Sequence, residues 1–405
     1  MTAVLRTLDG LDVAGKRVVV RADLNLPMNG DSIADDTRLR SVTPTLVELV
    51  EKGATVVVLS HFGRPNGKVV SDFSLAPLRR HLEQSAGRPV RFVPTDWAHG
   101  YPVDTASFAR SGEIILMENT RFHPGEEAND PAFSRRLANL GDVFVNDAFS
   151  VSHRAHASTE GIAQLLPSFA GRAMQAEIAA LDAVLGKPVR PIGALIGGAK
   201  ISTKLAILEN LVKRVDVLFV GGGMANTLLH AQGISVGRSI CEANLATVAE
   251  RILQQASEHG CEIVLPGDVV VAEKLAPSTI HSVVDVSRVP ADAMILDIGP
   301  ATVVESISRF ADIRTLLWNG PLGAFETEPF ERGTFALAQA AAKRTKAGGL
   351  LSVAGGGDTL AALSGAGVIN DFSYASTAGG AFLEWLEGRE LPGVAILRTD
   401  TAMEI

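Results

Sequence analysis

Short β-branched runs alternate along this chain with stretches that have the apolar spacing of amphipathic helices, and this alternation constrains the fold more than any other feature. Val18–Arg21 and Ala54–Ser60 have strand character, and between them Thr37–Lys52 places its apolar residues on one helical face and stops at Gly53. A strand, a helix and a strand in this order predict a βαβ unit with parallel strands.

The same alternation continues to the end of the chain. Further strands are predicted at Ile114–Met117, Val143–Val145, Pro191–Ile196, Val217–Val220, Ile263–Leu265, Met294–Ile298, Thr315–Trp318 and Leu350–Ala354. The 405 residues exceed the roughly 250 to 300 at which one hydrophobic core stops growing. We therefore expect an α/β protein of two doubly wound, Rossmann-like lobes, each built on a parallel sheet.

One amphipathic helix marks the expected boundary between the lobes. Ala173–Leu185 carries apolar residues at helical spacing and ends before Gly186-Lys187-Pro188. The expected division is a first lobe at residues 1–172, a connecting helix at 173–187 and a second lobe at 188–390.

Charge and cysteine content narrow the function. The formal net charge of −8 argues against nonspecific binding to nucleic acid or to anionic membranes, which favours basic surfaces. Cys241 and Cys261 form no metal-ligand or redox pattern, and no signal peptide or apolar run of about 20 residues is apparent. These features predict a cytoplasmic protein without structural disulfides.

Polar clusters follow four predicted strands of the first half. The clusters are Asp23-Leu24-Asn25, His61–Arg64, Glu118–Arg121 and Asn146-Asp147. Because ligands of open α/β sheets bind beyond the carboxyl ends of the strands, these clusters are expected to meet at one edge. Arginine donates paired hydrogen bonds to phosphate or carboxylate and stays charged. A site for a small, strongly anionic acid is predicted there.

The second half uses glycine and lysine instead. Gly197–Lys200 follows a strand and is expected to open a helix, where free N–H groups attract phosphate. Lys200 and Lys204 are then four residues apart and would share one helical face. Gly221–Gly223 and Gly355–Gly357 also follow strands, and they fit either a close approach to a ligand or a tight crossover.

The turn after the last triple glycine adds chemistry that suits a nucleotide. Asp358 offers a carboxylate to Mg²⁺ and Thr359 a hydroxyl at a helix start. No G-x-x-x-x-G-K-[ST] loop is present, so this prediction does not depend on the usual nucleotide motif.

Taken together, these motifs resemble the phosphoglycerate kinase family, in family order and from about Leu8 to Gly388. The matching segments are Val20–Pro27, His61–Pro65, Glu118–Phe122, His153–His156, Gly197–Lys200, Gly221–Met224, Trp318–Pro321 and Gly355–Thr359. The resemblance implies reversible transfer of the acyl phosphate of 1,3-bisphosphoglycerate to Mg-ADP, which gives 3-phosphoglycerate and ATP in glycolysis. It also implies a monomer whose lobes close on a hinge and whose segment 391–405 returns to the first lobe.

The family's functional residues carry over to positions in both halves. The resemblance implies that the glycerate substrate is bound by Asp23, Leu24, Asn25, Arg38, His61, Phe62, Gly63, Arg64, Arg121 and Arg154. The implied nucleotide-binding residues are Lys204, Gly299, Glu326, Gly355, Gly356, Gly357, Asp358 and Thr359. Those implied to act on the transferring phosphoryl group are Arg38, Lys200, Gly356 and Gly379. Asp358 is the implied Mg²⁺ ligand.

Some positions depart from the family pattern. Ser150-Val151-Ser152 replaces a glycine-threonine-alanine stretch, Ala378 stands in a glycine-rich turn, and Phe382 replaces a small polar residue. Ala378 would narrow that turn if the backbone there required a positive φ. The acidic pair Glu126-Glu127 is interpreted as a solvated loop that could form an ion pair with Arg121.

Two other functions stay open on the sequence. A dinucleotide-dependent oxidoreductase would explain the Gly-x-Gly patterns, although no G-x-G-x-x-G fingerprint opens a βαβ unit. A nonenzymatic binding or scaffold protein could keep the fold, but it has no need for Arg38, Lys200, Lys204 and Asp358 together.

Overall fold

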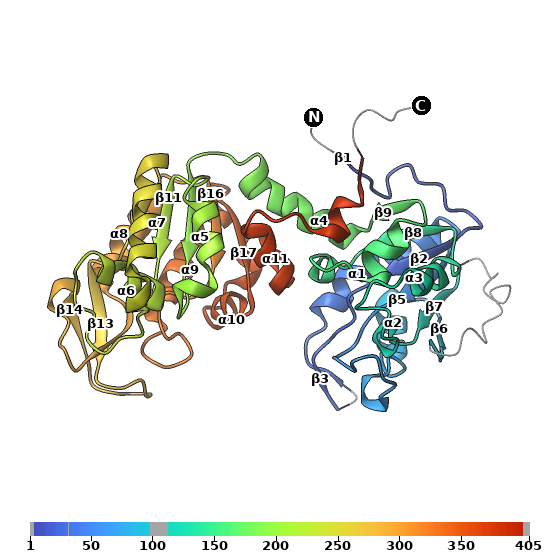
Figure 1. Cartoon of the computed structure of the whole chain (residues 1–405), viewed down its shortest axis with the longest axis horizontal. Coiled ribbons are helices and arrows are strands. Elements are labelled where there is room, and N and C mark those ends of the chain that lie inside the picture. The colour runs from blue at the N-terminus through green and yellow to red at the C-terminus, as the bar shows by residue number, and fades with distance from the viewer. Residues whose placement is uncertain (1–3, 31, 98–111, 400–405) are drawn as a thin grey trace. The chain divides into compact units, whose positions relative to one another are not determined.

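The structure is a computed structural model that describes residues 4–30, 32–97 and 112–399. The chain forms two compact units (Figure 1): the first unit contains residues 1–178 and 390–405, and the second unit contains residues 179–389. Strand β1 (Val4–Leu5) pairs antiparallel with β19 (Arg398–Thr399), so both ends of the described chain belong to the first unit. Residues 400–405 of the expected return segment lie outside the described residues.

Six parallel strands form the central sheet of the first unit. Their order across the sheet is β6 (Val90–Val93), β7 (Ile114–Met117), β5 (Thr55–Leu59), β2 (Arg17–Arg21), β8 (Val143–Asn146) and β9 (Ser168–Ala170). The hairpin of β3 (Met28–Asn29) and β4 (Ser32–Ile33) lies apart from this sheet. The doubly wound first lobe is confirmed, and the short strands β6 and β9 were missed.

Alternate residues of β2 point to opposite faces of the sheet, as in any strand. Val18 and Val20 pack with helices α1 (Thr37–Glu51) and α2 (Leu78–Ala86). Val19 packs on the other face, where α3 (Pro131–Ala138) contributes Phe133 and Leu137 to the core. Because β2 is buried on both faces, its sequence contains a continuous run of valines, which is typical of a strand in a parallel sheet.

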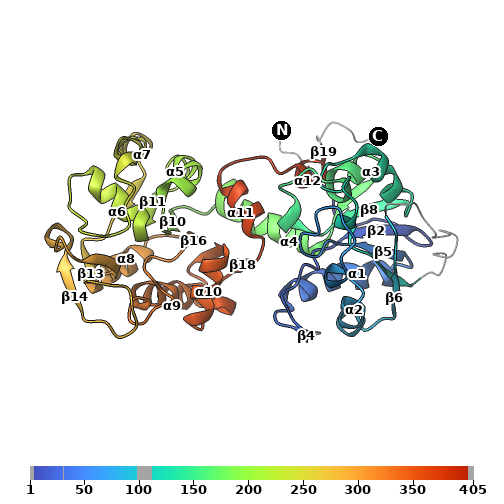
Figure 2. The ribbon, with the colours of Figure 1, turned by 60° about the horizontal axis from the view of Figure 1, so that its bottom comes forward.

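The second unit repeats this arrangement. Its parallel sheet has the order β12 (Glu262–Val264), β11 (Val217–Val220), β10 (Ile192–Ile196), β16 (Thr315–Asn319), β17 (Leu351–Gly355) and β18 (Tyr374–Ser376). Figure 2 shows helices on both sides of it. Those on one side are α5 (Leu205–Leu211), α6 (Gly222–Ala231) and α7 (Ala246–His259), and those on the other are α8 (Pro300–Phe310), α9 (Arg332–Lys346) and α10 (Gly357–Gly365).

One predicted strand belongs to a different sheet. Met294–Ile298 forms β15, but it pairs antiparallel with β13 (Asp268–Ala272), which also pairs with β14 (His281–Asp285). The expectation that this strand continues the second parallel sheet is therefore wrong. The apolar run of β15 is compatible with either sheet. Its partner β13 lies about 25 residues earlier in the chain, and the local sequence does not indicate which strand it pairs with.

Three more helices complete the described part of the chain. The segment expected to be one helix over Ala173–Leu185 forms α4 (Arg172–Leu181) followed by a π-helical turn at Asp182–Gly186. The others are α11 (Gly379–Leu386) and α12 (Pro392–Ala395). Within residues 4–30, 32–97 and 112–399, no helix has the length and hydrophobicity that a membrane span requires.

Candidate active site

The polar clusters of the first unit lie at the carboxyl ends of β2, β5, β7 and β8, as expected. Asp23 accepts a hydrogen bond from the amide of Asn25 at 3.1 Å, and Arg38 reaches the same segment from the first turn of α1. The Arg38 guanidinium donates to the carbonyl of Asn25 at 2.8 Å and lies 3.3 Å from an Asp23 carboxylate oxygen. The Asn25 side chain accepts from the amide of Gly63 at 2.9 Å. The segments after β2 and β5 are thus joined.

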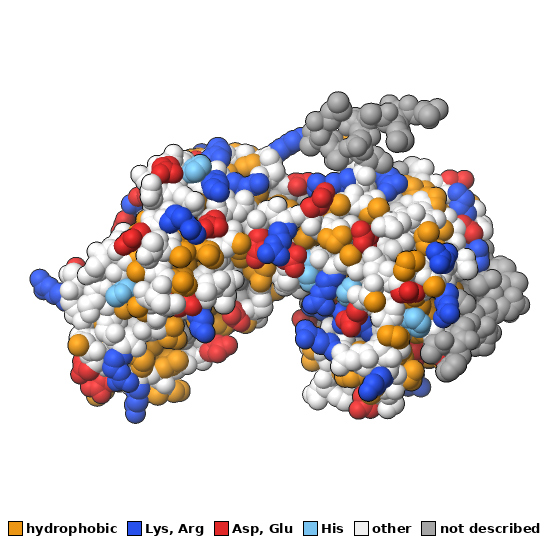
Figure 3. Space-filling model, in the orientation of Figure 1, with side chains coloured by type: hydrophobic (Ala, Val, Ile, Leu, Met, Phe, Trp, Pro, Cys, Tyr) orange, Lys and Arg blue, Asp and Glu red, His pale blue; other side chains and the backbone are white. Residues whose placement is uncertain are grey.

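Three more arginines gather at this edge. Arg121 is 5% exposed, and its guanidinium donates to the carbonyl of Gly63 at 2.9 Å. Burial lowers the pKa of Arg121, and the positive charges of Arg154 and Arg64 lower it further. Arg64 and Arg154 are exposed, and neither has a carboxylate partner among the described residues. Figure 3 shows Lys and Arg side chains beside histidine over the first unit.

The cations of this edge outnumber the carboxylates that interact with them. The five arginines are Arg21, Arg38, Arg64, Arg121 and Arg154, and the carboxylates that pair with them or act on their charge are Asp23, Glu126 and Glu127. Glu118 and Asp147 also follow strands at this edge, but their carboxylates accept hydrogen bonds from Ser74 and Leu75 and from Met174. Like charges repel one another at these distances, and the repulsion is relieved when an anion binds among them. The arrangement is suited to a ligand with several negative charges.

The two acidic residues of the pair at 126 and 127 differ in environment. Glu127 lies 3.2 Å from the Arg121 guanidinium, which confirms the expected ion pair. Glu126 is fully buried, so its interpretation as part of a solvated loop is wrong. It accepts hydrogen bonds from the hydroxyl and the amide of Ser158. Its position is set by partners far along the chain, which no local pattern indicates.

His61 and His156 are buried among the arginines. Burial lowers the pKa of His61 well below its ordinary value, and the neighbouring charge of Arg21 lowers it further. The same two causes lower the pKa of His156 to about 3. Both rings are therefore neutral at physiological pH.

Three substrate-binding candidates are held by packing or by backbone hydrogen bonds. Leu24 is fully buried, and its amide donates to the hydroxyl of Ser60 at 2.9 Å. Phe62 packs edge-on against Phe73. Gly63 has a φ of 61°, and a Cβ there would lie 2.4 Å from the Phe73 ring. These residues shape the loop that carries His61 and Arg64.

The lysines of the second unit are not placed as expected. Lys200 is extended and precedes a 3₁₀ turn at Ile201–Thr203, and helix α5 begins only at Leu205. The prediction that Gly197–Lys200 opens a helix with Lys200 and Lys204 on one face is therefore wrong. The turn inserted between them resets the helical spacing. Lys200 is exposed, whereas Lys204 folds back over the turn.

Lys204 is held by backbone carbonyls. Its ammonium donates to the carbonyls of Gly197 at 2.6 Å and of Asn319 at 3.2 Å. Burial lowers the pKa of Lys204 to about 8, and the negative charge of Asp358 opposes that shift. A charged lysine with one carboxylate in range and two neutral acceptors retains the ability to bind a phosphate.

Glycines in the second unit let backbone segments touch each other. A Cβ on Gly197 would lie 1.7 Å from the carbonyl oxygen of Pro321, and one on Gly223 would lie 2.1 Å from that of Ala199. Gly222 has a φ of 66°, and its Cβ would meet the carbonyl of Gly198 at 2.7 Å. Close packing of the crossovers therefore accounts for the glycines after β10 and β11.

The glycines at the start of α10 and α11 have different surroundings. Gly356 has a φ of 100°, which favours glycine, whereas a Cβ on Gly357 would meet nothing within 4 Å. Gly379 opens α11 and is also free of close neighbours. Thr359 is 1% exposed, and its hydroxyl donates to the carbonyl of Gly355 and accepts from the amide of Gly320. Thr359 thus supports the turn from within.

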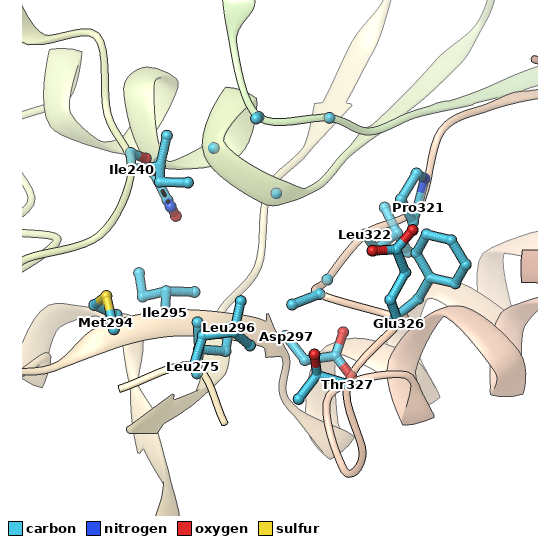
Figure 4. A pocket seen from close by; sticks show the side chains of 18 of the residues that line it. Ile240, Leu275, Met294, Ile295, Leu296, Asp297, Pro321, Leu322, Glu326 and Thr327 are labelled. Carbon is cyan, nitrogen blue, oxygen red and sulfur yellow. Dashed lines mark hydrogen bonds between the residues drawn. The ribbon is translucent and has the colours of Figure 1, made fainter. Parts of the chain in front are cut away.

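A pocket of about 360 Å³ lies in the second unit (Figure 4). Of the nucleotide-binding candidates, Glu326 and Asp358 line it. The candidates that do not line it are Lys204, Gly299, Gly355, Gly356, Gly357 and Thr359. Gly299 is buried, and a Cβ there would lie 2.2 Å from the Asp268 carboxylate.

The walls of this pocket are apolar, and sequence reasoning missed them. They include Ile240, Leu275, Met294, Ile295, Leu296 and Leu322. Asp297 is buried beside them and accepts from the amides of Ile298 at 2.9 Å and Gly333 at 2.7 Å. Burial raises the pKa of Asp297 to about 8. The strand run at 294–298 was visible in the sequence, but its position in the pocket wall depends on the antiparallel sheet.

Asp358 is the carboxylate that the sequence predicts as a metal ligand. It is exposed in the first turn of α10, and no group of three or more His, Cys, Asp or Glu in the described ranges could hold a metal. A single protein carboxylate fits Mg²⁺ that arrives with phosphate oxygens and water, which is its usual mode of binding.

Comparison with known proteins identifies the family of this chain. The family model described as "Phosphoglycerate kinase" matches residues 8–389. The chain belongs to the phosphoglycerate kinase family.

Relatives cover the chain almost completely. The phosphoglycerate kinase of Rhizorhabdus wittichii is 57% identical over 97% of this chain and 99% of that protein. That of Agrobacterium fabrum is 54% identical over 97% and 98%. The structure of phosphoglycerate kinase from Coxiella burnetii has a TM-score of 0.91 at 42% identity and covers 97% of this chain and 99% of that one. The two-lobed α/β fold is confirmed.

Departures from the pattern of phosphoglycerate kinase are accommodated locally. Ala378 has a φ of −84°, so no positive φ is required there and the expected narrowing does not apply. The ring of Phe382 is fully buried and packs on Gly355, where a Cβ would lie 2.6 Å from it. Ser150 donates to the Asp23 carboxylate at 2.5 Å.

Proposed function

We propose that this chain catalyses reversible transfer of the acyl phosphate of 1,3-bisphosphoglycerate to Mg-ADP, giving 3-phosphoglycerate and ATP. The acceptor in the reverse direction is a carboxyl group. The observation that carries the proposal is the group of five arginines at the carboxyl edge of the first sheet, which outnumber the carboxylates that pair with them or act on their charge. Membership of the phosphoglycerate kinase family supports it.

In this proposal the first unit binds the glycerate. Arg64, Arg121 and Arg154 would neutralise the phosphate, and Asp23 and Asn25 would accept and donate hydrogen bonds at the glycerate hydroxyl and carboxylate. Arg38 would lie at the carboxyl group that carries the migrating phosphoryl. Guanidinium groups suit these anions because they donate paired hydrogen bonds and stay charged.

The second unit would bind the nucleotide. Its apolar pocket suits the adenine base, because flat, weakly polar rings gain free energy when they leave water. Glu326 would accept from a sugar hydroxyl, and Lys204, Lys200 and the turn at Gly355–Gly357 would contact phosphates. Asp358 would hold the Mg²⁺, which supplies positive charge to the phosphate oxygens.

The residues needed for this reaction are donors and cations. The attacking ADP oxygen and the leaving carboxylate are both anions, so no proton has to be transferred. The barrier is lowered by fixed positive groups that follow the charge of the phosphoryl group. Lys200 and the open α10 and α11 N-termini at Gly356 and Gly379 would supply this stabilisation from the second unit, and Arg38 from the first.

An assay of ATP formation from ADP and enzymatically generated 1,3-bisphosphoglycerate tests the proposal. ATP must form only when both substrates and Mg²⁺ are present. Nicotinamide turnover without ATP would favour the oxidoreductase alternative. Binding of 3-phosphoglycerate and ADP with no turnover would favour a scaffold protein.

A further inference from the structure

A buried chain of hydrogen bonds lies beneath the arginines of the first unit. It begins at Glu126, which accepts from the hydroxyl of Ser158, and that hydroxyl accepts from Arg21 Nε at 2.8 Å. It ends where Arg21 Nη2 meets His61 Nδ1 at 3.1 Å. Arg21 and Glu126 are each 0% exposed. None of the steps of phosphoryl transfer described above uses Arg21, Ser158 or Glu126.

The guanidinium of Arg21 is held in a fixed plane. Nε donates to Ser158, Nη1 to the carbonyl of Ala22 and Nη2 to His61, so all three nitrogens are engaged. Glu126 lies close enough to favour the charged form of Arg21. A buried arginine without such partners would be strongly unfavourable, so the network is complete as a unit.

This geometry determines the proton position on His61. An arginine nitrogen can only donate, so His61 Nδ1 must present its lone pair. In a neutral ring the proton then lies on Nε2. Within residues 4–30, 32–97 and 112–399, His61 Nε2 makes no hydrogen bond, and the residue is 4% exposed.

We propose that Arg21 is a positioning residue that locks His61 in the tautomer with its proton on Nε2, so that the uncharged ring donates a hydrogen bond to the anionic substrate. The kinetic part of this inference rests on the proposed function. Arg21 itself stays beneath the ring and acts through it.

A neutral donor has an advantage at this position. His61 lies within range of the charges on Arg21, Arg38 and Arg121, and His156 is also near. A further positive charge would add repulsion to this group in the absence of substrate. A neutral N–H adds specificity for an acceptor oxygen without that penalty, and the lowered pKa of His61 agrees with this role.

The tautomer can be measured directly. In protein labelled with ¹⁵N-histidine, two-bond ¹H–¹⁵N correlation spectra distinguish a protonated from an unprotonated ring nitrogen, and the His61→Gln variant assigns the signal. We expect unprotonated Nδ1 and protonated Nε2 across pH 6 to 8. A proton on Nδ1, or a charged ring at pH 7, would overturn the proposal without any variant at Arg21.

Arg21→Lys tests the cause. Lysine keeps the charge, but its single ammonium cannot serve the three acceptors in one plane. We expect a mixture of His61 tautomers and a KM for 3-phosphoglycerate raised about tenfold, which corresponds to one lost hydrogen bond, with the KM for ATP unchanged. An unchanged tautomer in a folded Arg21→Lys protein overturns the proposal.

Arg17→Lys is the matched control, because Arg17 stands at the other end of the same strand and pairs with Asp142 at 2.8 Å. We expect it to leave the His61 spectrum and both KM values unchanged. A shift as large as that of Arg21→Lys would show that any arginine change in β2 disturbs the ring, and would sink the inference. Absence of kinase activity in the wild type would instead overturn the proposed function, because the spectra do not depend on turnover.

Discussion

The anion sites proposed for the two units are built in different ways. The first unit presents side chains: arginines held by hydrogen bonds to Asn25 and Gly63, above a buried network that fixes His61. The second unit presents backbone at the starts of α10 and α11, and its crossovers after β10 and β11 pack so closely that Gly197 and Gly223 have no room for a Cβ. A site formed by charged side chains should lose function when one charge is removed. A site formed by closely packed backbone should lose function or stability when a methyl group is added.

Removing the Arg38 side chain should have the largest effect. We expect Arg38→Ala to lower kcat about a thousandfold, equivalent to about 4 kcal/mol, because a positive donor is lost where charge develops. The KM for either substrate should change much less, as steady-state kinetics can show. Arg40→Ala, on the same helix with its side chain 68% exposed, is the control. Equal losses in turnover and affinity, or none, would count against a transition-state role.

Adding a methyl group at Gly197 should act on folding. Because the Cβ would lie 1.7 Å from the Pro321 carbonyl, Gly197→Ala should lower the free energy of unfolding by about 3 kcal/mol, measured by urea denaturation. Gly357→Ala is the matched variant, since a Cβ there meets no protein atom within 4 Å. It should preserve stability and weaken ATP binding. Loss of stability in both variants would erase the distinction between packing glycines and ligand-facing ones.

The pH dependence of the two sites should differ. The pKa of Lys204 is lowered to about 8, so its positive charge is lost as the pH rises through that value. We expect kcat/KM for ATP to fall about tenfold between pH 7 and 9, while kcat/KM for 3-phosphoglycerate stays flat because arginine does not titrate there.

A Lys204→Arg variant should remove the decline for ATP. An equal fall in kcat/KM for both substrates would place the titrating group outside the nucleotide site.

The effect of pH on stability has the opposite sign to its effect on ATP binding. Because unfolding raises the pKa of Lys204, the unfolded chain binds more protons between pH 8 and about 10, and stability from this group rises over that range.

The smallest effect is expected at Ser150, where the family pattern has glycine. Ser150→Ala removes one donor from the buried Asp23 carboxylate and should lower the free energy of unfolding by about 1 kcal/mol. Ser150→Gly should lower it by a few tenths of a kcal/mol more, because glycine loses more backbone freedom on folding. Thermal unfolding of both variants tests this, and an unchanged midpoint for Ser150→Ala would show that the hydroxyl contributes nothing.

The side-chain site was easier to predict than the backbone site. Asp23, His61 and Arg121 each follow an apolar strand run. Their residue types and their positions after the strands together predicted a polar site at the carboxyl edge of the first sheet. The lysines were misplaced because a 3₁₀ turn at Ile201–Thr203 separates them from α5, and short turns leave little trace in apolar spacing.

Long-range contacts account for the other differences. Glu126 is adjacent to a second glutamate and looks solvated, but Ser158 and the charge of Arg21 hold it in the core. Met294–Ile298 was found as a strand, but its partner β13 lies in a separate antiparallel sheet. Strand pairing, and the contacts that neutralise a buried charge, depend on residues far apart in the chain. The periodicity of apolar residues in one segment carries no information about such contacts.

The pairing of β1 with β19 has a consequence for synthesis on the ribosome. Residues 179–389 emerge as a contiguous piece, so the second unit has its full set of strands before the last residues are translated. The first unit, although its sequence is made first, still lacks β19 and α12 at that moment. We therefore expect the first unit to complete its folding only after the carboxyl-terminal strand has been translated. The usual order, in which the amino-terminal domain folds first, would then be reversed.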